Sequence, residues 1–234
     1  MIMNKTKNLL VIHGSARASR SLTRMLTQKF LGAWRATGLA GEIIQRDVGQ
    51  HPPPFVSEAW IASAFKPEAE RTEPERKVLE YSDRAITELS EADVIVMATP
   101  MYNFGLPAAV KAWVDQIIRI GKTFSFDLAR GDRPLEPVLS GKRLVTLTAA
   151  GDFGFEEGGV HASMNHLHPH IRTLSTYLGV SKSWDVSIEY QEFGDERFLQ
   201  SKQDAIQRIN PVVDELVSSF ESERCSATGG KNSF

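Results

Sequence analysis

The sequence predicts a three-layer α/β fold built on a doubly wound, parallel, five-stranded sheet. Short runs of consecutive apolar residues, such as 9–12 and 94–98, alternate with longer stretches in which apolar residues recur at helical spacing. Continuous apolar runs are typical of strands that are buried on both faces. Strands that alternate with helices form a parallel sheet covered on both sides, because each crossover connection is right-handed and spans the sheet.

The expected elements follow from this alternation. Five strands are expected at 9–12, 42–46, 94–98, 144–147 and 184–188. Helical spacing predicts helices at 21–38, 75–89, 110–118, 163–178 and 196–220. The stretch 50–74 lacks regular periodicity and is expected to be a long excursion with a helical piece near 57–64. One domain is expected over residues 1–220, and the polar segment 221–234 is expected to be a flexible tail.

Composition narrows the classes of partner and compartment. The formal net charge of -2 gives no basic footprint for nucleic acid, so nucleic-acid binding is not expected. Cys225 is the single cysteine, which rules out an intrachain disulfide and fits a reducing cytoplasm. The apolar run 9–12 is too short for an export signal, and no stretch approaches the ~20 apolar residues of a membrane span. We therefore expect a cytoplasmic protein without a membrane segment.

The loop 14–21 is the first candidate site, because ligands of open α/β sheets lie beyond the carboxyl ends of the strands. It joins a buried strand to a helix N-terminus, where free N–H groups favour an anion. Its side-chain donors are Ser15, Arg17, Ser19, Arg20 and Ser21. The loop matches neither the dinucleotide fingerprint nor the P-loop. A phosphate site is one interpretation; a helix capped by Ser19 or Ser21 with solvated arginines is the other.

The loop 99–107 is the second candidate site. It brings Tyr102, Asn103 and Phe104 to the end of a strand, where a flat heteroaromatic ring could stack and be hydrogen-bonded along its edge. The alternative is a buried turn in which Tyr102 and Phe104 belong to the core. A third loop, 148–154, follows the next strand and is expected at the same edge of the sheet.

The segment 92–104, with its run Pro-Met-Tyr-Asn-Phe at 100–104, resembles bacterial FMN-dependent NADH azoreductases, which are also NAD(P)H:quinone reductases. The resemblance extends from about residue 8 to about residue 217. It includes the serine-rich first loop and, further along, Lys111, Trp113, Asp115, Gly121, Thr123, Phe124, Gly141, Lys142, Tyr177, Leu178 and Gly179.

This resemblance implies a flavodoxin-like fold and a homodimer that holds one FMN per subunit at its interface. By this resemblance, Ser15, Ser19, Arg20 and Ser21 would hold the phosphate and ribityl chain of FMN, and Met101, Tyr102, Asn103 and Phe104 would line the isoalloxazine ring. We assign Arg17 and Pro100, from the same two loops, to FMN binding as well. Phe126 matches an aromatic position that borders the substrate pocket in relatives, and we assign Phe153 to the same pocket.

The third loop departs from the family pattern. Ala150, Gly151 and Asp152 stand where relatives commonly have Arg-Gly-Gly or Gly-Gly, whose amides face the flavin pyrimidine, and Ala149 precedes them. We assign all four to FMN binding. An acidic side chain close to the ring would oppose the anionic reduced flavin, so either Asp152 points away or the redox potential is lowered.

The expected function is two-electron, ping-pong transfer from NADH or NADPH through FMN to a quinone or azo compound. No catalytic side chain is expected, because the flavin carries the chemistry. Two alternatives stay open: an NADPH-dependent FMN reductase, and a non-enzymatic flavodoxin-type electron carrier. Such carriers are shorter and strongly acidic, unlike this chain.

The histidines 161, 166, 168 and 170 suggest a metal site, since 166 and 170 would share a helical face. Pro169 interrupts that spacing, and no cysteine or clear carboxylate partner accompanies the group. We therefore expect no metal.

Overall fold

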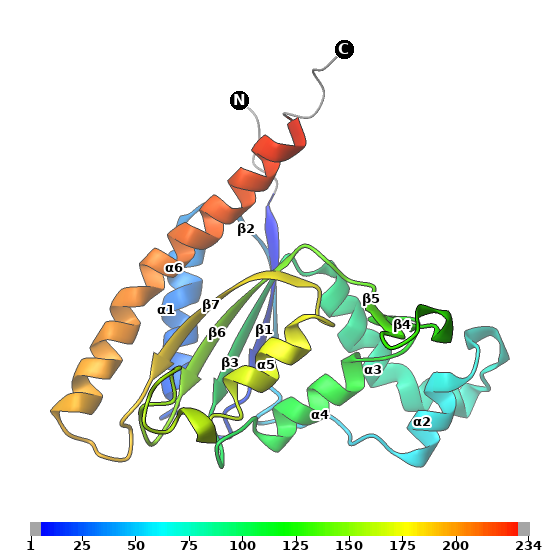
Figure 1. Ribbon diagram of the computed structural model, residues 1–234, viewed down its shortest axis with the longest axis horizontal. Helices are drawn as coiled ribbons and strands as arrows, with labels where there is room; N and C mark the ends of the chain where they lie inside the picture. Colours follow the sequence, from blue (N-terminus) through cyan, green and yellow to red (C-terminus); the bar gives the residue numbers. More distant parts are fainter. Residues whose placement is uncertain (1–5, 229–234) are drawn as a thin grey trace.

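One parallel sheet lies between two layers of helices in the computed structural model, which describes residues 6–228 (Figure 1). Its strand order is β2-β1-β3-β6-β7, and every neighbouring pair is parallel. In chain order these strands are β1 (Lys7–His13), β2 (Ala40–Arg46), β3 (Val94–Pro100), β6 (Lys142–Ala149) and β7 (Val180–Ile188). The predicted three-layer, doubly wound, five-stranded sheet is therefore confirmed.

The strand order fixes where a ligand can enter. The chain passes from β1 outward to β2 and then returns to the other side of β1 with β3. The order reverses at this point, so the loops that leave β1 and β3 diverge and open a crevice at the carboxyl edge of the sheet. The loops after β6 and β7 end at the same edge, because all five strands run in one direction.

Each face of the sheet is covered by its own helices. On one face lie α1 (Leu22–Ala36) and α6 (Glu196–Thr228). On the other lie α3 (Glu73–Glu91), α4 (Ala108–Ile117) and α5 (His168–Ser175) (Figure 1). Both cores contain a fully buried tryptophan, Trp34 in the first and Trp113 in the second. None of the described helices is both long enough and apolar enough to cross a membrane.

Two of the expected helices differ from the structure by more than two residues at an end. The helix expected at 163–178 is wrong as one element: a short 3-10 turn, η3 (Ala162–Met164), precedes α5. Asn165 separates them, because its side-chain oxygen accepts hydrogen bonds from the backbone N–H groups of Leu167 and His168. At the end of the chain, α6 continues to Thr228 instead of stopping at 220. Residues 229–234 of the expected tail lie outside the described residues.

The excursion between β2 and α3 contains the expected helical piece. Ser57 begins α2 (Glu58–Phe65), since its hydroxyl accepts a hydrogen bond from the N–H of Trp60. A 3-10 turn, η1 (Glu68–Glu70), follows. Buried Arg71 then donates to the carbonyl oxygens of Ser63, Ala64 and Lys66 and so closes the C-terminal end of α2.

A small hairpin between α4 and β6 was not predicted. It pairs β4 (Phe124–Phe126) with β5 (Leu135–Pro137) in antiparallel fashion, and η2 (Leu128–Arg130) forms part of its connection. Each strand has only three residues, which is too short for a hydrophobic period to be recognised in the sequence.

Candidate functional site

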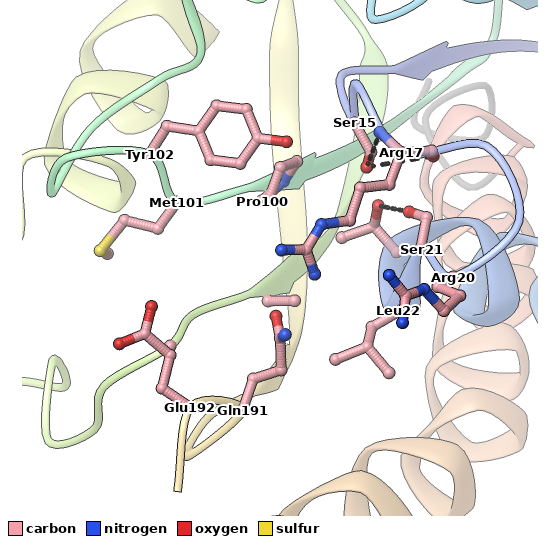
Figure 2. Close-up of a pocket in the computed structure, with 13 residues that line it drawn as sticks. Ser15, Arg17, Arg20, Ser21, Leu22, Pro100, Met101, Tyr102, Gln191 and Glu192 are labelled. Atoms are coloured by element: carbon pink, nitrogen blue, oxygen red, sulfur yellow. Dashed lines mark hydrogen bonds between the residues drawn. The ribbon is translucent and has the colours of Figure 1, made fainter. Parts of the chain in front are cut away.

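An open cavity of about 170 Å³ lies at the carboxyl edge of the sheet, where the loops after β1, β3 and β6 meet (Figure 2). Nine residues expected at the site line it, namely Ser15, Arg17, Arg20, Ser21, Pro100, Met101, Tyr102, Ala149 and Gly151. The structure thus brings together all three loops that the sequence singled out. Four further lining residues were not expected, namely Leu22, Thr23, Gln191 and Glu192.

The first loop supplies hydroxyl groups and positive charge to this cavity. Ser15 is almost fully buried, and its hydroxyl accepts a hydrogen bond of 3.2 Å from the N–H of Arg17. Ser21 caps α1 by accepting from the N–H of Arg24, so the capping role proposed for Ser21 is real. Arg17 reaches into the open space in Figure 2, and neither it nor Arg20 forms an ion pair with another described residue. Ser19 is exposed and does not line the cavity.

The second loop forms a strained turn beside the cavity. Tyr102 and Gly105 exchange backbone hydrogen bonds of 3.0 and 3.1 Å, and the two residues between them, Asn103 and Phe104, both have positive φ angles (46° and 67°). A bulky residue rarely adopts such a φ, and this strain is typical of functional segments. Tyr102 and Phe104 are each 39% exposed, so the alternative of a buried core turn is wrong. Asn103 and Phe104 lie outside the cavity lining of this chain.

The third loop turns its acidic residue away from the cavity. Asp152 accepts a hydrogen bond from the N–H of Phe153, and its other oxygen lies 3.7 Å from Nδ1 of His161. Neither Asp152 nor buried Ala150 lines the cavity. Of the two possibilities left open for Asp152, the structure therefore supports the one in which it points away.

A different carboxylate reaches the cavity from the segment after β7. Gln191 and Glu192 lie opposite Met101 and Tyr102 in Figure 2. Glu192 folds over Gly151: its N–H donates to the carbonyl of Gly151 at 3.0 Å, and a Cβ added to Gly151 would lie 2.8 Å from Cγ of Glu192. A side chain at 151 would therefore push the flexible side chain of Glu192 out of this position.

The two residues assigned to a substrate pocket lie in different surroundings. Phe153 stacks on Tyr190 with ring centroids 4.5 Å apart and also contacts Phe193 edge to face. Phe126 lies on β4 and is 48% exposed. Neither lines the cavity within its own chain.

The four histidines do not form a metal-binding group in the structure. His161 is engaged with the carbonyl of Phe153, and His168 with Asn165 and Thr148. Burial lowers the pKa of His168, although Asp185 and Glu189 act in the opposite direction. Within residues 6–228 there is no set of three or more His, Cys, Asp or Glu side chains placed to hold a metal ion.

The donor set fits a phosphate ester joined to a flat ring. Arg17 and Arg20 form no ion pair within residues 6–228 and lie beside the N-terminus of α1, an environment that favours an anion. On the far side, Pro100, Met101 and Tyr102 give an apolar wall against which a ring can lie. The residues present therefore suit FMN.

Comparison with known proteins identifies the family and the fold. A family model described as a flavodoxin-like fold matches residues 7–210. An FMN-dependent NADH:quinone oxidoreductase 2 of Idiomarina loihiensis is 47% identical over 215 residues, which cover 89% of this chain and 90% of that protein. An FMN-dependent NAD(P)H:quinone oxidoreductase 1 of Pseudomonas aeruginosa is 40% identical over 202 residues, which cover 86% of this chain and 95% of that protein.

A solved structure has the same architecture. It is that of an FMN-dependent NADH-azoreductase from Bacillus anthracis in complex with FMN, which superposes with a TM-score of 0.78 at 18% identity. The match covers 90% of this chain and 99% of that one.

Proposed function

The chain belongs to the flavodoxin-like family of FMN-dependent NADH:quinone oxidoreductases, and from this premise we propose that it passes two electrons from NADH or NADPH to a quinone or azo compound through bound FMN. One observation carries the proposal. Two arginines without an ion-pair partner among the described residues, Arg17 and Arg20, line the same cavity as the apolar wall, and this cavity lies at the switch point of the sheet. When bound, FMN supplies the redox chemistry, in which it takes up a hydride and then gives two electrons to the acceptor.

The chain's own residues bind and orient. We propose that Ser15, Arg17, Ser19, Arg20 and Ser21 hold the phosphate and ribityl chain, because they gather donors at the N-terminus of α1. The strained turn after β3 holds Pro100, Met101 and Tyr102 in one orientation, which would fix the plane of the ring. The third loop would contribute backbone groups from 149–152.

We also propose that the active form is a homodimer. A cavity of about 170 Å³ is smaller than the few hundred Å³ usual for cofactor pockets. Tyr102 and Phe104 leave apolar surface exposed beside the cavity, and Phe126, which is exposed and does not line the cavity of its own chain, is free to border that of a second copy. Sedimentation equilibrium tests this point, and a monomer at micromolar concentration would count against it. We further propose a cytoplasmic location, which the single cysteine favours.

Stopped-flow absorption tests the activity. Protein loaded with FMN and freed of unbound flavin is mixed without oxygen with NADH or NADPH, and the oxidised flavin band is followed. We expect fast bleaching whose rate saturates with the nucleotide. The reduced protein, mixed with benzoquinone or methyl red in a second step, should recover the band.

The two alternatives give other outcomes. An electron carrier would show no bleaching with either nucleotide. An FMN reductase would release its reduced flavin, so the flavin would pass through a filtration membrane that retains the protein. Either result would contradict the proposed function.

A further inference from the structure

The turn that follows β2, residues 47–50, presses directly on the first loop. The N–H of Gly49 donates to the carbonyl of His13 at 2.9 Å. A Cβ added to Gly49 would lie only 2.2 Å from the carbonyl oxygen of Ser15, far inside contact distance. The two backbones therefore touch, and the side chains of Asp47 and Gln50 flank the contact.

Arg24 of α1 joins this turn to the loop through four hydrogen bonds. Its terminal nitrogens each donate at 2.7 Å to one carboxylate oxygen of Asp47. The same guanidinium donates to the carbonyl of Ser15 at 2.8 Å and to the carbonyl of Arg17 at 2.9 Å. Only the planar guanidinium can make this set at once, because its N–H groups lie in a fixed fork.

Gln50 completes the arrangement. Its side-chain amide donates to the carbonyl of Ala16 at 2.5 Å, while its own N–H donates to Asp47 at 3.1 Å. The three consecutive carbonyls of residues 15–17 are therefore all held by donors from outside the loop. None of the three holding residues, Arg24, Asp47 and Gln50, lines the cavity.

A carbonyl oxygen carries partial negative charge and opposes a bound anion. Donors that fix all three carbonyls against α1 and the 47–50 turn keep them from rotating toward the ligand, so the loop can present its N–H groups, hydroxyls and arginines. We propose that Arg24, Asp47 and Gln50 act as a clamp that positions the first loop and gives the protein its preference for the phosphorylated flavin FMN over riboflavin. This inference rests on the proposed function, in which the loop holds the FMN phosphate.

The charge state of Asp47 supports the clamp. Burial would raise the pKa of this carboxyl, but the hydrogen bonds from Arg24 and from the N–H of Gln50 outweigh it and hold the pKa below its usual range. The carboxylate therefore stays ionised and keeps both Arg24 contacts at neutral pH.

The ratio of FMN affinity to riboflavin affinity tests the clamp. Flavin-free protein is titrated with each flavin, and quenching of flavin fluorescence is followed. Arg24→Gln should weaken FMN binding by about 10- to 100-fold, as expected for lost charge-assisted hydrogen bonds, and change riboflavin binding by less than about twofold. Arg24→Lys keeps the charge but not the fork, so it should also lower the ratio, by about fivefold or more.

Two further variants keep the test decisive. Arg46→Gln is the matched control, because Arg46 lies one residue before Asp47 and pairs with Glu88 without touching the loop. It should leave the ratio unchanged. Gln50→Ala removes a single donor from an exposed position and should lower the ratio by about threefold even if the Arg24 variants fail to fold.

The outcomes separate the clamp from the function. A wild-type protein that prefers FMN, together with Arg24→Lys and Gln50→Ala variants that keep the same ratio, would overturn the clamp alone. A wild-type protein that binds neither flavin would overturn the proposed function, and the clamp with it.

Discussion

The two walls of the cavity are built by different means. The first loop, residues 14–21, is held from outside by side chains that donate to its carbonyls. The opposite wall, to which Ala149, Gly151, Gln191 and Glu192 contribute, is held by backbone hydrogen bonds. Tyr190, Gln191 and Glu192 each donate an N–H to a carbonyl of the third loop, at 3.1, 3.3 and 3.0 Å.

The aromatic rings behind the opposite wall reinforce this difference. Phe153 and Tyr190 stack, and Arg197 lies over the ring of Tyr190 with 5.2 Å between its guanidinium carbon and the ring centroid. Tyr190 has a φ of 62°, which is uncommon for a bulky residue. The first wall is thus held in place by the polar clamp, which we propose selects an anion, whereas the second is a packed platform that carries one carboxylate, Glu192, to the cavity.

The largest expected effect comes from crowding the first wall. Gly49→Ala places a methyl group 2.2 Å from the carbonyl oxygen of Ser15, so the turn or the loop must shift. We expect FMN affinity to fall by about 100-fold and the free energy of unfolding to fall by about 1–3 kcal/mol, as is typical of overpacking. Fluorescence titration and urea unfolding measure the two quantities.

Gly32→Ala is the control for this substitution. Gly32 lies in α1 with no atom within 4 Å of an added Cβ, so the change should stabilise the protein by about 0.5–1 kcal/mol and leave FMN binding unchanged. Wild-type FMN affinity in Gly49→Ala would show that the contact between the turn and the loop is irrelevant to the site.

The second wall should act on redox potential more than on affinity. The carboxylate of Glu192 opposes the negative charge that FMN gains on reduction, so Glu192→Gln should raise the midpoint potential. A change of about 1 kcal/mol corresponds to roughly 20 mV for a two-electron couple. Equilibration with a reference dye measures the potential, and Glu196→Gln, an exposed change outside the cavity, is the control. An unchanged or lower potential in Glu192→Gln would contradict this role.

The smallest expected effect is on pH dependence. Burial lowers the pKa of His168, which contacts Thr148 at the end of β6 and so lies behind the second wall. As pH falls below about 6.5, His168 is protonated more in the unfolded chain than in the folded protein. The free energy of unfolding therefore decreases in acid, whereas at about pH 8 this histidine has no such effect. His168→Gln should flatten the slope of unfolding free energy between about pH 7 and pH 5. If His168→Gln keeps the wild-type slope, other groups cause the pH dependence and this prediction is wrong.

Asp47, at the first wall, also contributes less to stability in acid, but only at a lower pH than His168. Its pKa lies below the usual aspartate value, so its contribution to stability is present above about pH 4 and is lost only as pH falls through the lowered pKa. Between about pH 5 and pH 8 we therefore expect the contribution of Asp47 to the free energy of unfolding to stay constant, while that of His168 changes.

The fold followed from the sequence because its signals are local. The central strands β1 and β3 contain short apolar runs such as 94–98, whose side chains are fully buried in the structure. The break before α5 escaped prediction, because it depends on how the side chain of Asn165 bonds to the backbone two and three residues later. The β4–β5 hairpin escaped because its strands are too short to show a period.

The same contrast holds within the site. The first loop was recognised because a serine- and arginine-rich segment stands between a buried strand and a helix. Gln191 and Glu192 were missed because backbone bonds to 150 and 151 place them, and such bonds leave no pattern in the sequence. Their position was a signal, however, since both residues lie in the segment that follows the fifth predicted strand, 184–188. The rule that drew attention to the ends of the other strands applies there equally.

A crystal structure of the protein with FMN is the most direct test of the central claim that the loop after β1 anchors a flavin phosphate. The account predicts the phosphate beside Ser15, Arg17, Arg20 and Ser21, with the ring along Met101 and Tyr102. A phosphate bound elsewhere, or a ring that does not reach the turn after β3, would contradict it.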